Sequence, residues 1–537
     1  MSTTCDAVVI GAGHNGLVAA NLLADAGWEV VVVEAAPHAG GAVRSADVTA
    51  PGFTTDMYSA FYPMTAASPI IAGLHLEDHG LTWTHAPTVL AHLRPDGPAA
   101  VLHRDAERTA AGIEADHPGD GEAWLELAGE WSRYGPELMR ALLSPFPPVR
   151  AGLRLALAAR LDLWDLARRS ILPVRTMATE LFAGDMGPLL LAGNALHADV
   201  TPEAAPSAFL GWMLVGLGQT VGFPVPVGGS GGIIDALVAR LAAAGGEVRL
   251  GEPVEQVVVR DGRAVGIRTA GEFVEARHGV LAACDAQLLY GGLLDETELP
   301  TSFLARMRQF QRASSTVKVN YALSSPVPWT DALARTAGTV HIADSVDELT
   351  STAAELATAK VPTDPFLLVG QMTTADATRS PSGTESLWMY THVPQHSVGD
   401  GAGRIDIDGP MSGRALDEFV ERMEDRVEAK APGFRSTVIA RHVQGPADME
   451  RDNPSLVGGD ISGGTTQLHQ QLVFRPVPGL GRAETPITGL YLASSSAHPG
   501  GSVHGACGAN AARAAMVGRR AGGLRRALAG SRLGPRS

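Results

Sequence analysis

The first sixty residues alternate between apolar runs and glycine-rich turns, a pattern typical of an α/β unit. An apolar, β-branched run over residues 7–10 predicts a strand that is buried on both faces. Helical periodicity follows from Leu17 to Ala24, and Gly27 lies where that helix is expected to end. A second apolar run at residues 30–33 predicts another strand. The chain therefore opens with a strand, a helix and a second strand.

The turn between the first strand and the helix has the spacing G-x-G-x-x-G, formed by Gly11, Gly13 and Gly16. The first glycine permits a tight turn, the second lets the backbone approach a pyrophosphate, and the third lets the helix pack on the strand. Phosphates would lie at the helix N-terminus, where unpaired amides and the helix dipole favour anions. Glu34 follows the second strand, where a carboxylate can bind the hydroxyls of a ribose. These features predict a dinucleotide site.

Two later regions repeat the α/β character. Residues 225–290 contain a glycine cluster at 228–232, a predicted helix at 233–244, and predicted strands at 247–250, 254–260, 264–269 and 280–285. The glycine cluster also fits an ordinary turn before a helix. Near the C-terminus, residues 489–493 predict a strand, 498–501 a turn, and Ser502 or Val503 the start of a helix that runs to about Met516.

These motifs resemble those of a known family. Gly40, Gly41 and Arg44 follow Glu34 closely, and the C-terminal region reads TGLYLASSSAHPGGSVHGACG. Both resemble the FAD-binding oxidoreductases of the flavin amine oxidase and phytoene desaturase superfamily. With its GHNGL loop, the chain looks most like the branch that carries the name pyridine nucleotide-disulfide oxidoreductase domain-containing proteins. The resemblance is specific at about residues 5–62, 225–290 and 486–517. The chain has no second G-x-G-x-x-G motif, so nothing indicates a separate NADPH domain.

The resemblance implies an α/β fold in which a Rossmann-type FAD-binding domain is interleaved with a mixed α+β substrate domain. The FAD-binding domain would comprise residues 1–75, 225–299 and 460–517, and the substrate domain residues 76–224 and 300–459. The basic tail, residues 518–537, is expected to be disordered.

The resemblance also implies a set of FAD-binding residues. Val254 would offer its backbone to the adenine. Many relatives have Gly-Asp where this chain has Ser494-Ser495, so the contact of Ser495 with the ribityl chain would be a hydrogen bond without charge. The implied set is Gly11, Gly13, His14, Asn15, Gly16, Glu34, Ala35, Gly40, Gly41, Arg44, Ser59, Val254, Ser495, Gly501 and Val503.

Three side chains are candidates for chemistry beside the flavin. Lys318 lies in an alternating stretch that predicts a strand and resembles the strand of amine oxidases whose lysine reaches a water at the flavin's reactive nitrogen. A cation there would help oxygen accept electrons; the alternative is an ordinary ion-paired lysine. His498 and His504 flank the predicted C-terminal turn and could donate a hydrogen bond or act as acid or base, or only fix the loop. Cys507 is expected to be a small buried residue rather than a covalent flavin link.

Composition narrows the function further. Acidic residues outnumber basic ones by 57 to 42, a formal net charge of −15, which argues against nucleic-acid binding. Cys5, Cys284 and Cys507 form no C-x-x-C pair, which excludes a disulfide scaffold, a zinc ribbon and a redox dithiol built on that motif. The sequence contains no HExxH motif and no His/Cys cluster, so it predicts no metal site. Without a signal peptide or a long apolar run, the sequence favours a cytoplasmic protein.

One basic segment, residues 138–175, combines seven arginines and two aspartates with an apolar stripe. Leu153, Leu157, Leu161 and Trp164 have helical spacing and share the segment with arginines. Such a helix can lie on an anionic membrane surface and give access to a lipophilic substrate. The same stripe fits a core-packed helix or an oligomer contact, and the sequence leaves the oligomeric state open.

We therefore expect an FAD-dependent oxidoreductase of the desaturase or dehydrogenase type. It would take a hydride equivalent from an apolar small molecule, and oxygen or a quinone would reoxidise the flavin. Two alternatives stay open. One is an amine oxidase that uses Lys318 near the flavin, and the other is a flavin-stabilised scaffold without turnover.

Overall fold

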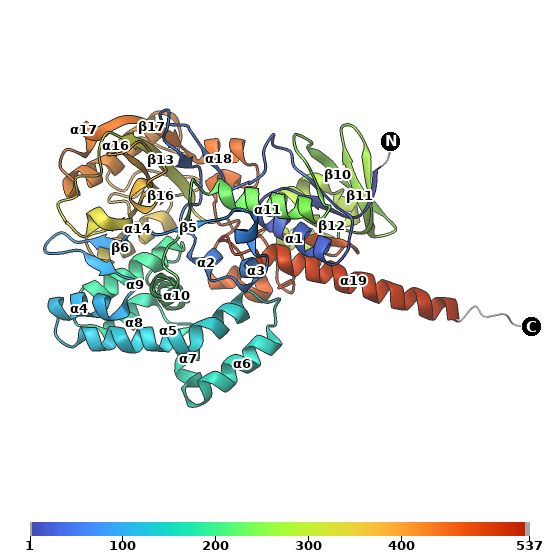
Figure 1. Cartoon of the computed structure of the whole chain (residues 1–537), viewed down its shortest axis with the longest axis horizontal. Helices are drawn as coiled ribbons and strands as arrows, with labels where there is room; N and C mark the ends of the chain where they lie inside the picture. The colour runs from blue at the N-terminus through green and yellow to red at the C-terminus, as the bar shows by residue number, and fades with distance from the viewer. Residues whose placement is uncertain (1–2, 532–537) are drawn as a thin grey trace, which may run out of the picture.

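The computed structural model describes residues 3–531 and contains two seven-stranded sheets, one on each side of the molecule in Figure 1. The first sheet has the order β10-β11-β12-β1-β2-β9, and β18 pairs with β12. Its strands are β1 (Thr3–Ile10), β2 (Val30–Val33), β9 (Glu247–Arg249), β10 (Val254–Arg260), β11 (Arg263–Thr269), β12 (Phe273–Ala282) and β18 (Leu490–Leu492).

The first sheet joins three distant parts of the chain. β1 lies between β12 and β2 and pairs in parallel with both, so Val9 faces Val32 on one side and Leu281 on the other. The helices α1 (His14–Asp25), α11 (Gly231–Ala243) and α19 (Ala506–Ser531) lie side by side against the sheet, with α1 in contact with both of the others. The apolar run of β1 is buried on both faces because of this packing.

The second sheet has the order β17-β13-β16-β15-β14-β6-β7 and is mostly antiparallel. Helix α16 (Gly413–Lys430) packs on one face through Phe419, Val420, Met423 and Val427. Helix α9 (Met186–His197) contacts β6 and β7. The strands are β6 (Thr88–Leu93), β7 (Ala100–Leu102), β13 (Ser315–Leu323), β14 (Ala337–Ile342), β15 (Leu367–Gln371), β16 (Glu385–Val393) and β17 (Val438–Gln444).

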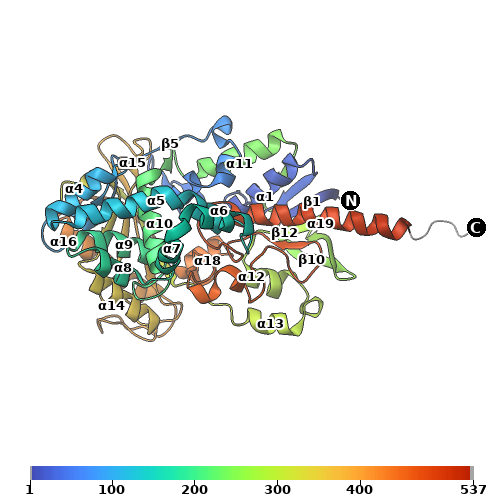
Figure 2. The same cartoon turned by 90° about the horizontal axis from the view of Figure 1, so that it is seen from below.

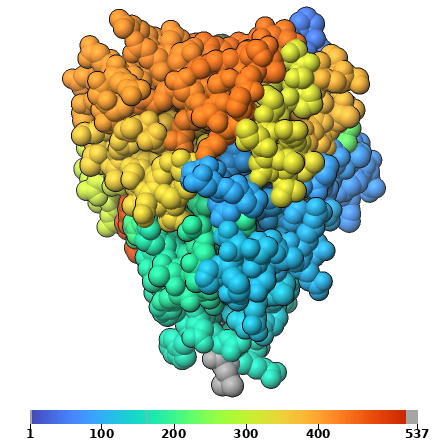
Figure 3. Space-filling model, turned by 90° about the vertical axis from the view of Figure 1, so that its left-hand side faces the viewer, coloured from blue at the N-terminus to red at the C-terminus, as the bar shows by residue number. Residues whose placement is uncertain are grey.

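A layer of helices lies below the second sheet in Figure 1 and in front in Figure 2. Helices α9 and α10 pack together and against their helical neighbours, and the layer narrows toward α6 and α7 at the lower end of Figure 3. The members are α4 (Ala106–Asp116), α5 (Asp120–Leu142), α6 (Val149–Ala159), α7 (Leu163–Arg169), α8 (Val174–Leu181), α9 and α10 (Ser207–Thr220).

Short elements connect these layers. The strands are β3 (Ser45–Ala46), β4 (Thr55–Asp56), β5 (Trp83–Thr84) and β8 (Val225–Pro226). The helices are α2 (Pro63–Ala66), α3 (Pro69–Ala72), α12 (Ala286–Leu288), α13 (Thr301–Met307), α14 (Val346–Ala357), α15 (Met372–Ala375), α17 (Phe434–Thr437) and α18 (Pro446–Asp452). Among the described helices, none is long and apolar enough to cross a membrane.

The predicted fold class is confirmed: a Rossmann-type sheet built from discontinuous segments is interleaved with a second, mixed unit. The expected helix start at Ser502 or Val503 was wrong. Ser502 and Gly505 both have left-handed φ values, 88° and 71°, so the last helix begins only at Ala506. The domain boundaries stay predictions.

Two further expectations differ from the structure. The stripe from Leu153 to Trp164 lies on two helices rather than one, because Arg160 has a φ of 45° and breaks the path between α6 and α7. The tail after Gly518, expected to be disordered, continues as helix α19 to Ser531, since alanine, leucine and arginine favour a helix and no proline occurs before Pro535. Residues 532–537 lie outside the described residues.

Candidate functional site

Two glycine turns form a cradle beside the start of α1. Gly13 and Gly40 form a parallel bridge, and the Gly40 amide donates to the Ala12 carbonyl at 2.9 Å. A Cβ on Gly41 would lie 3.4 Å from the Gly13 Cα. The wall of the cradle is therefore bare backbone, which allows a phosphate chain to approach the amides at the start of the helix.

Glu34 is fixed at the edge of this cradle. Its carboxylate accepts the Ala12 amide at 2.7 Å and the Ala36 amide at 2.9 Å. The Glu252 amide donates to the Glu34 carbonyl at 2.9 Å, which brings the turn before Val254 to the same place. The carboxylate is thereby held where a ribose would leave the phosphates, with the backbone of Val254 nearby.

A cavity of about 590 Å³ lies between the C-terminal turn and the second sheet. The lining is apolar and aromatic for most of its area, and none of its described residues is Asp, Glu, Lys or Arg. Walls come from α10, from the end of α5, from residues 58–65 and from strand β16. The main side chains are Phe61, Leu138, Phe209, Leu210, Met213, Leu214, Phe223, Trp388 and Tyr390.

The turn after residue 497 closes one end of the cavity and contributes His498, Gly501, Val503 and His504. The His498 Nε2 lies 3.0 Å from the Ser144 carbonyl, and burial lowers the pKa of His498 to about 4. The His504 Nδ1 accepts the Ala506 amide at 3.0 Å, and burial lowers its pKa to about 3. Both imidazoles are therefore neutral near pH 7, and His504 satisfies an amide at the start of α19.

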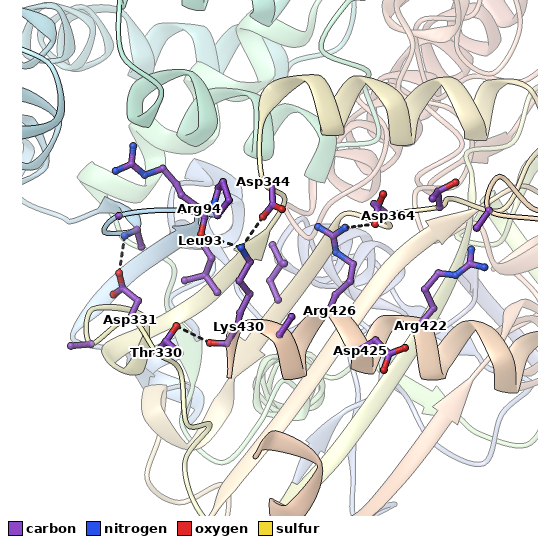
Figure 4. Close-up of a pocket in the computed structure, with 18 of the residues that line it drawn as sticks. Leu93, Arg94, Thr330, Asp331, Asp344, Asp364, Arg422, Asp425, Arg426 and Lys430 are labelled. Carbon is purple, nitrogen blue, oxygen red and sulfur yellow. Dashed lines mark hydrogen bonds and ion pairs between the residues drawn. The ribbon is translucent and has the colours of Figure 1, made fainter. Parts of the chain in front are cut away.

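A second cleft, of about 800 Å³, lies beside α16 on the outer side of the second sheet (Figure 4). It is lined by many charged side chains, but they pair with one another: Lys430 with Asp344 at 2.8 Å, and Arg426 with Asp364 at 3.1 Å. This cleft contains none of the predicted site residues. The apolar cavity is the candidate functional site, because its lining includes Ser59 and four predicted residues of the C-terminal turn, His498, Gly501, Val503 and His504.

Comparison with known sequences accounts for the glycine cradle and the apolar cavity. The model of the flavin-containing amine oxidoreductase family matches residues 16–391. The chain belongs to this family.

Several relatives of the protein align over nearly their full length. It is 28% identical to pyridine nucleotide-disulfide oxidoreductase domain-containing protein 2 of Mus musculus, over 94% of this chain and 92% of that protein. It is 25% identical to one subunit of the limonene dehydrogenase of Castellaniella defragrans, over 95% and 94% of the two chains. It is also 25% identical to a lycopene-forming phytoene desaturase of Pseudescherichia vulneris, over 95% and 98%.

Solved structures show the same fold at low sequence identity. An oxidoreductase from Methanosarcina mazei superposes with a TM-score of 0.60 at 16% identity, covering 95% of this chain and 99% of that one. Putrescine oxidase superposes with a TM-score of 0.56, also at 16% identity, over 96% and 99%. The predicted family and the predicted class of enzyme, a flavin-dependent oxidoreductase, are confirmed.

FAD is the cofactor of this family, and the residues present fit it. The side-chain-free cradle suits a diphosphate, and the His14 Nε2 and the Arg44 Nε are buried without a partner among the described residues. Bound FAD supplies the hydride-accepting ring. The protein's own task is to orient that ring, to exclude water and to place charge around it.

The structure brings most of the predicted residues to one of two places. Gly11, Gly13, Gly16, Glu34, Ala35, Gly40 and Gly41 lie at the cradle. Ser59, His498, Gly501, Val503 and His504 line the cavity. Arg44 donates to the His38 Nε2 at 2.6 Å, and the Asn15 Oδ1 lies 3.5 Å from the Gly508 amide, which ties α1 to α19.

Ser495 and Lys318, both predicted to lie beside the flavin, are not among the residues that line the cavity. The Ser495 carbonyl accepts two hydrogen bonds from Arg475, and its side chain faces Gly463. Lys318 lies behind the wall, where its Nζ donates to the carbonyls of Asp56 and Tyr58.

The electrostatics around Lys318 were not predicted from the sequence. Its Nζ lies 5.5 Å from the ring centre of Trp388, which lines the cavity, and burial lowers the pKa of Lys318 to about 7. Asp56 opposes that shift and Arg379 adds to it. Asp56 and Arg379 form a fully buried ion pair of 2.8 Å. Nothing in the local sequence marks Arg379, because it lies 323 positions from Asp56 in the chain.

Proposed function

We propose that the protein dehydrogenates an apolar substrate and passes a hydride to FAD. The observation that carries this proposal is the cavity lining, which contains many apolar and aromatic side chains, neutral histidines and no described charged residue. Transfer of a hydrocarbon chain or ring from water into such a cavity is favourable, by about 25 cal/mol per Å² of buried apolar surface.

The same lining argues against an amine substrate. A cationic amine loses hydration in an apolar cavity and needs a carboxylate or a set of acceptors in return. The described wall offers no Asp or Glu. The names of two relatives, a limonene dehydrogenase and a phytoene desaturase, support dehydrogenation of a carbon–carbon bond in an isoprenoid-type molecule.

The proposed reaction divides two hydrogens of the substrate. One leaves as a hydride to the flavin, and the other leaves as a proton from the neighbouring carbon, so that a double bond forms. Among the histidines that line the cavity, His197 and His498 each have an Nδ1 without a partner in the described residues and could accept that proton, whereas the Nδ1 of His504 already accepts the Ala506 amide. Oxygen or a quinone then reoxidises the flavin in this proposal.

We also propose that the substrate arrives from a lipid surface. Helices α6 and α7 carry the exposed apolar side chains Leu153, Leu157 and Trp164, the last with an exposed fraction of 81%. Arg150 and Arg154 share α6 with them. Pro148 and Ser170, which flank these two helices, line the cavity. An apolar face with arginines beside a cavity opening suits an anionic bilayer.

Anaerobic mixing tests the proposed substrate class. The oxidised, FAD-loaded protein is mixed in separate experiments with a monoterpene, a polyene in detergent, a long-chain fatty acid and an aliphatic amine. We expect bleaching of the flavin band with an isoprenoid and none with the amine. Bleaching by amines alone would establish an amine oxidase, and tightly bound flavin that no compound bleaches would favour the scaffold.

A further inference from the structure

Arg475 is a fully buried arginine directly behind the C-terminal turn of the cavity. Its exposed fraction is 1%. A Cβ on Gly500 would lie 3.4 Å from the Arg475 Cζ, so the guanidinium touches the back of the turn that carries His498 and Gly501. No motif in the sequence marks this residue, which lies in the stretch Phe474-Arg475-Pro476.

Every hydrogen bond of this guanidinium goes to a backbone carbonyl. Its Nε and Nη2 donate to Ser495 at 2.9 and 2.7 Å, and its Nη1 donates to Thr465 at 2.9 Å. Its Nη2 also donates to Ser462 at 3.2 Å and to Gly463 at 2.7 Å. Ser462 itself lines the cavity. The cation therefore joins the segment of residues 462–465, where Ser462 lines the cavity, to Ser495, which precedes the C-terminal turn.

The balancing negative charge lies on the other side of the loop. The buried Asp460 carboxylate accepts the amides of Ser462 at 2.8 Å, Gly464 at 2.7 Å and Ala313 at 3.2 Å. The loop of residues 460–465 thus has its amides bound by a carboxylate and its carbonyls bound by a guanidinium. Asp460 also lies 3.9 Å from Arg312, which forms a bidentate pair with Asp285 at 2.7 Å.

The four side chains carry two positive and two negative charges, and among them Arg475 lies behind the C-terminal turn. Within the described residues, Arg475 has no carboxylate partner of its own, whereas Arg312 and the two aspartates interact with one another. Burial lowers the pKa of Arg475 to about 10, and the guanidinium stays charged at neutral pH. A charge in such a dry environment acts over a longer distance than it would in water.

We propose that Arg475 is a positioning residue whose buried positive charge stabilises the negative charge that the flavin gains on reduction. The residue acts through the turn at Gly500 and Gly501 and does not itself contact the substrate cavity. A substitution that removes the charge makes reduction of the flavin less favourable. A substitution that keeps the charge but replaces the guanidinium leaves the reduction nearly unchanged.

The test measures the midpoint potential of the bound FAD by equilibrium reduction against a reference dye at pH 6.5. Wild type is compared with Arg475→Lys, which keeps the charge with fewer hydrogen-bond donors, and with Arg475→Gln, which keeps two donors without the charge. We expect about a tenfold less favourable reduction in Arg475→Gln, a shift of about 30 mV to lower potential for two electrons. Arg475→Lys should lie close to wild type.

Equal shifts in both variants, or no shift in either, would overturn the proposal. Loss of FAD from both variants alike would overturn it too, because the residue would then serve only loop packing. FAD content, measured by absorbance after denaturation, separates these outcomes. The experiment needs no substrate, so its result is independent of whether the proposed dehydrogenation is correct.

Discussion

Gly16 packs so closely against Gly11 that a Cβ on residue 16 would collide with the Gly11 carbonyl oxygen and would lie 3.1 Å from the Ala283 Cβ. Helix α1 therefore touches the strand-ending turn of β1 and the residue that follows β12 at a single point. This contact sets the height of the first amides of α1 above the sheet, and with it the floor on which the phosphates of FAD would rest.

Replacing Gly16 with alanine should therefore separate α1 from the sheet. We expect a loss of about 2–3 kcal/mol in the free energy of unfolding and a protein that is purified largely without FAD. The matched control is Gly112→Ala, in α4, where a Cβ would meet nothing within 4 Å. That variant should gain about 0.5–1 kcal/mol and keep its FAD. Equal melting temperatures and FAD contents in the two variants would refute this role of Gly16.

Lys318 offers a prediction that depends on pH. Because burial lowers the pKa of its ammonium to about 7, the side chain is positive below pH 7 and neutral above it. We propose that the positive form speeds the reaction of the reduced flavin with oxygen from behind the wall formed by Tyr58 and Trp388. Stopped-flow reoxidation of Lys318→Met should be about tenfold slower than wild type at pH 6 and equal to it at pH 9. Equal rates at both pH values would exclude this role.

Buried histidines predict a loss of stability in acid. Burial lowers the pKa of both His92 and His197 to about 4, from an ordinary value of 6.5. The unfolded chain therefore binds more protons than the folded one between pH 6.5 and 4, so the free energy of unfolding falls as the pH falls through this range. Across this range, each of the two histidines lowers the free energy of unfolding by up to about 3 kcal/mol.

His197→Phe should weaken this acid dependence. The His197 ring packs edge-on against His341 and Tyr390, with centroid distances of 5.9 and 6.2 Å, so phenylalanine can occupy the same place. Urea titrations at pH 7 and pH 5 measure the difference in unfolding free energy, with the exposed His396→Gln as the control. A difference as large in His197→Phe as in wild type would contradict the assignment.

The lipid surface proposed for α6 and α7 is tested by co-sedimentation with liposomes. Wild type should sediment with vesicles that contain one third anionic lipid and much less with neutral ones. Leu153→Asp combined with Trp164→Ala should abolish binding, whereas Ile439→Asp, which alters an apolar residue on β17 with an exposed fraction of 54%, should leave it intact. Failure of wild type to bind either kind of vesicle rejects the proposal.

The parts of the fold that depend on local sequence could be predicted, and the parts that depend on long-range packing could not. The apolar run of β1, the glycine spacing and Glu34 act over a few residues, so their pattern identifies the cradle. The break at Arg160 and the late start of α19 depend on backbone angles that the residue types only weakly favour. Arg379 and Arg475 became visible only when Asp56, Ser495 and the loop at 460–465 came together in space.

The position of Lys318 illustrates the same limit. The alternating pattern correctly predicts a strand, since β13 covers Ser315–Leu323. The pattern does not say that residues 56–58 cross in front of this strand and cover the ammonium with two carbonyls. Strand and face follow from the sequence, whereas the layer that lies between a side chain and the cavity does not.

The central claim, dehydrogenation of an apolar molecule in the apolar cavity, is tested most directly by a single turnover without oxygen. One equivalent of the isoprenoid that bleaches the flavin is mixed with the FAD-loaded protein, and the molecular mass of the extracted product is measured by mass spectrometry. We expect one reduced flavin for each product molecule and a product lighter by two hydrogens. Reduction of the flavin only by amines, with an aldehyde or ketone as product, would contradict the claim.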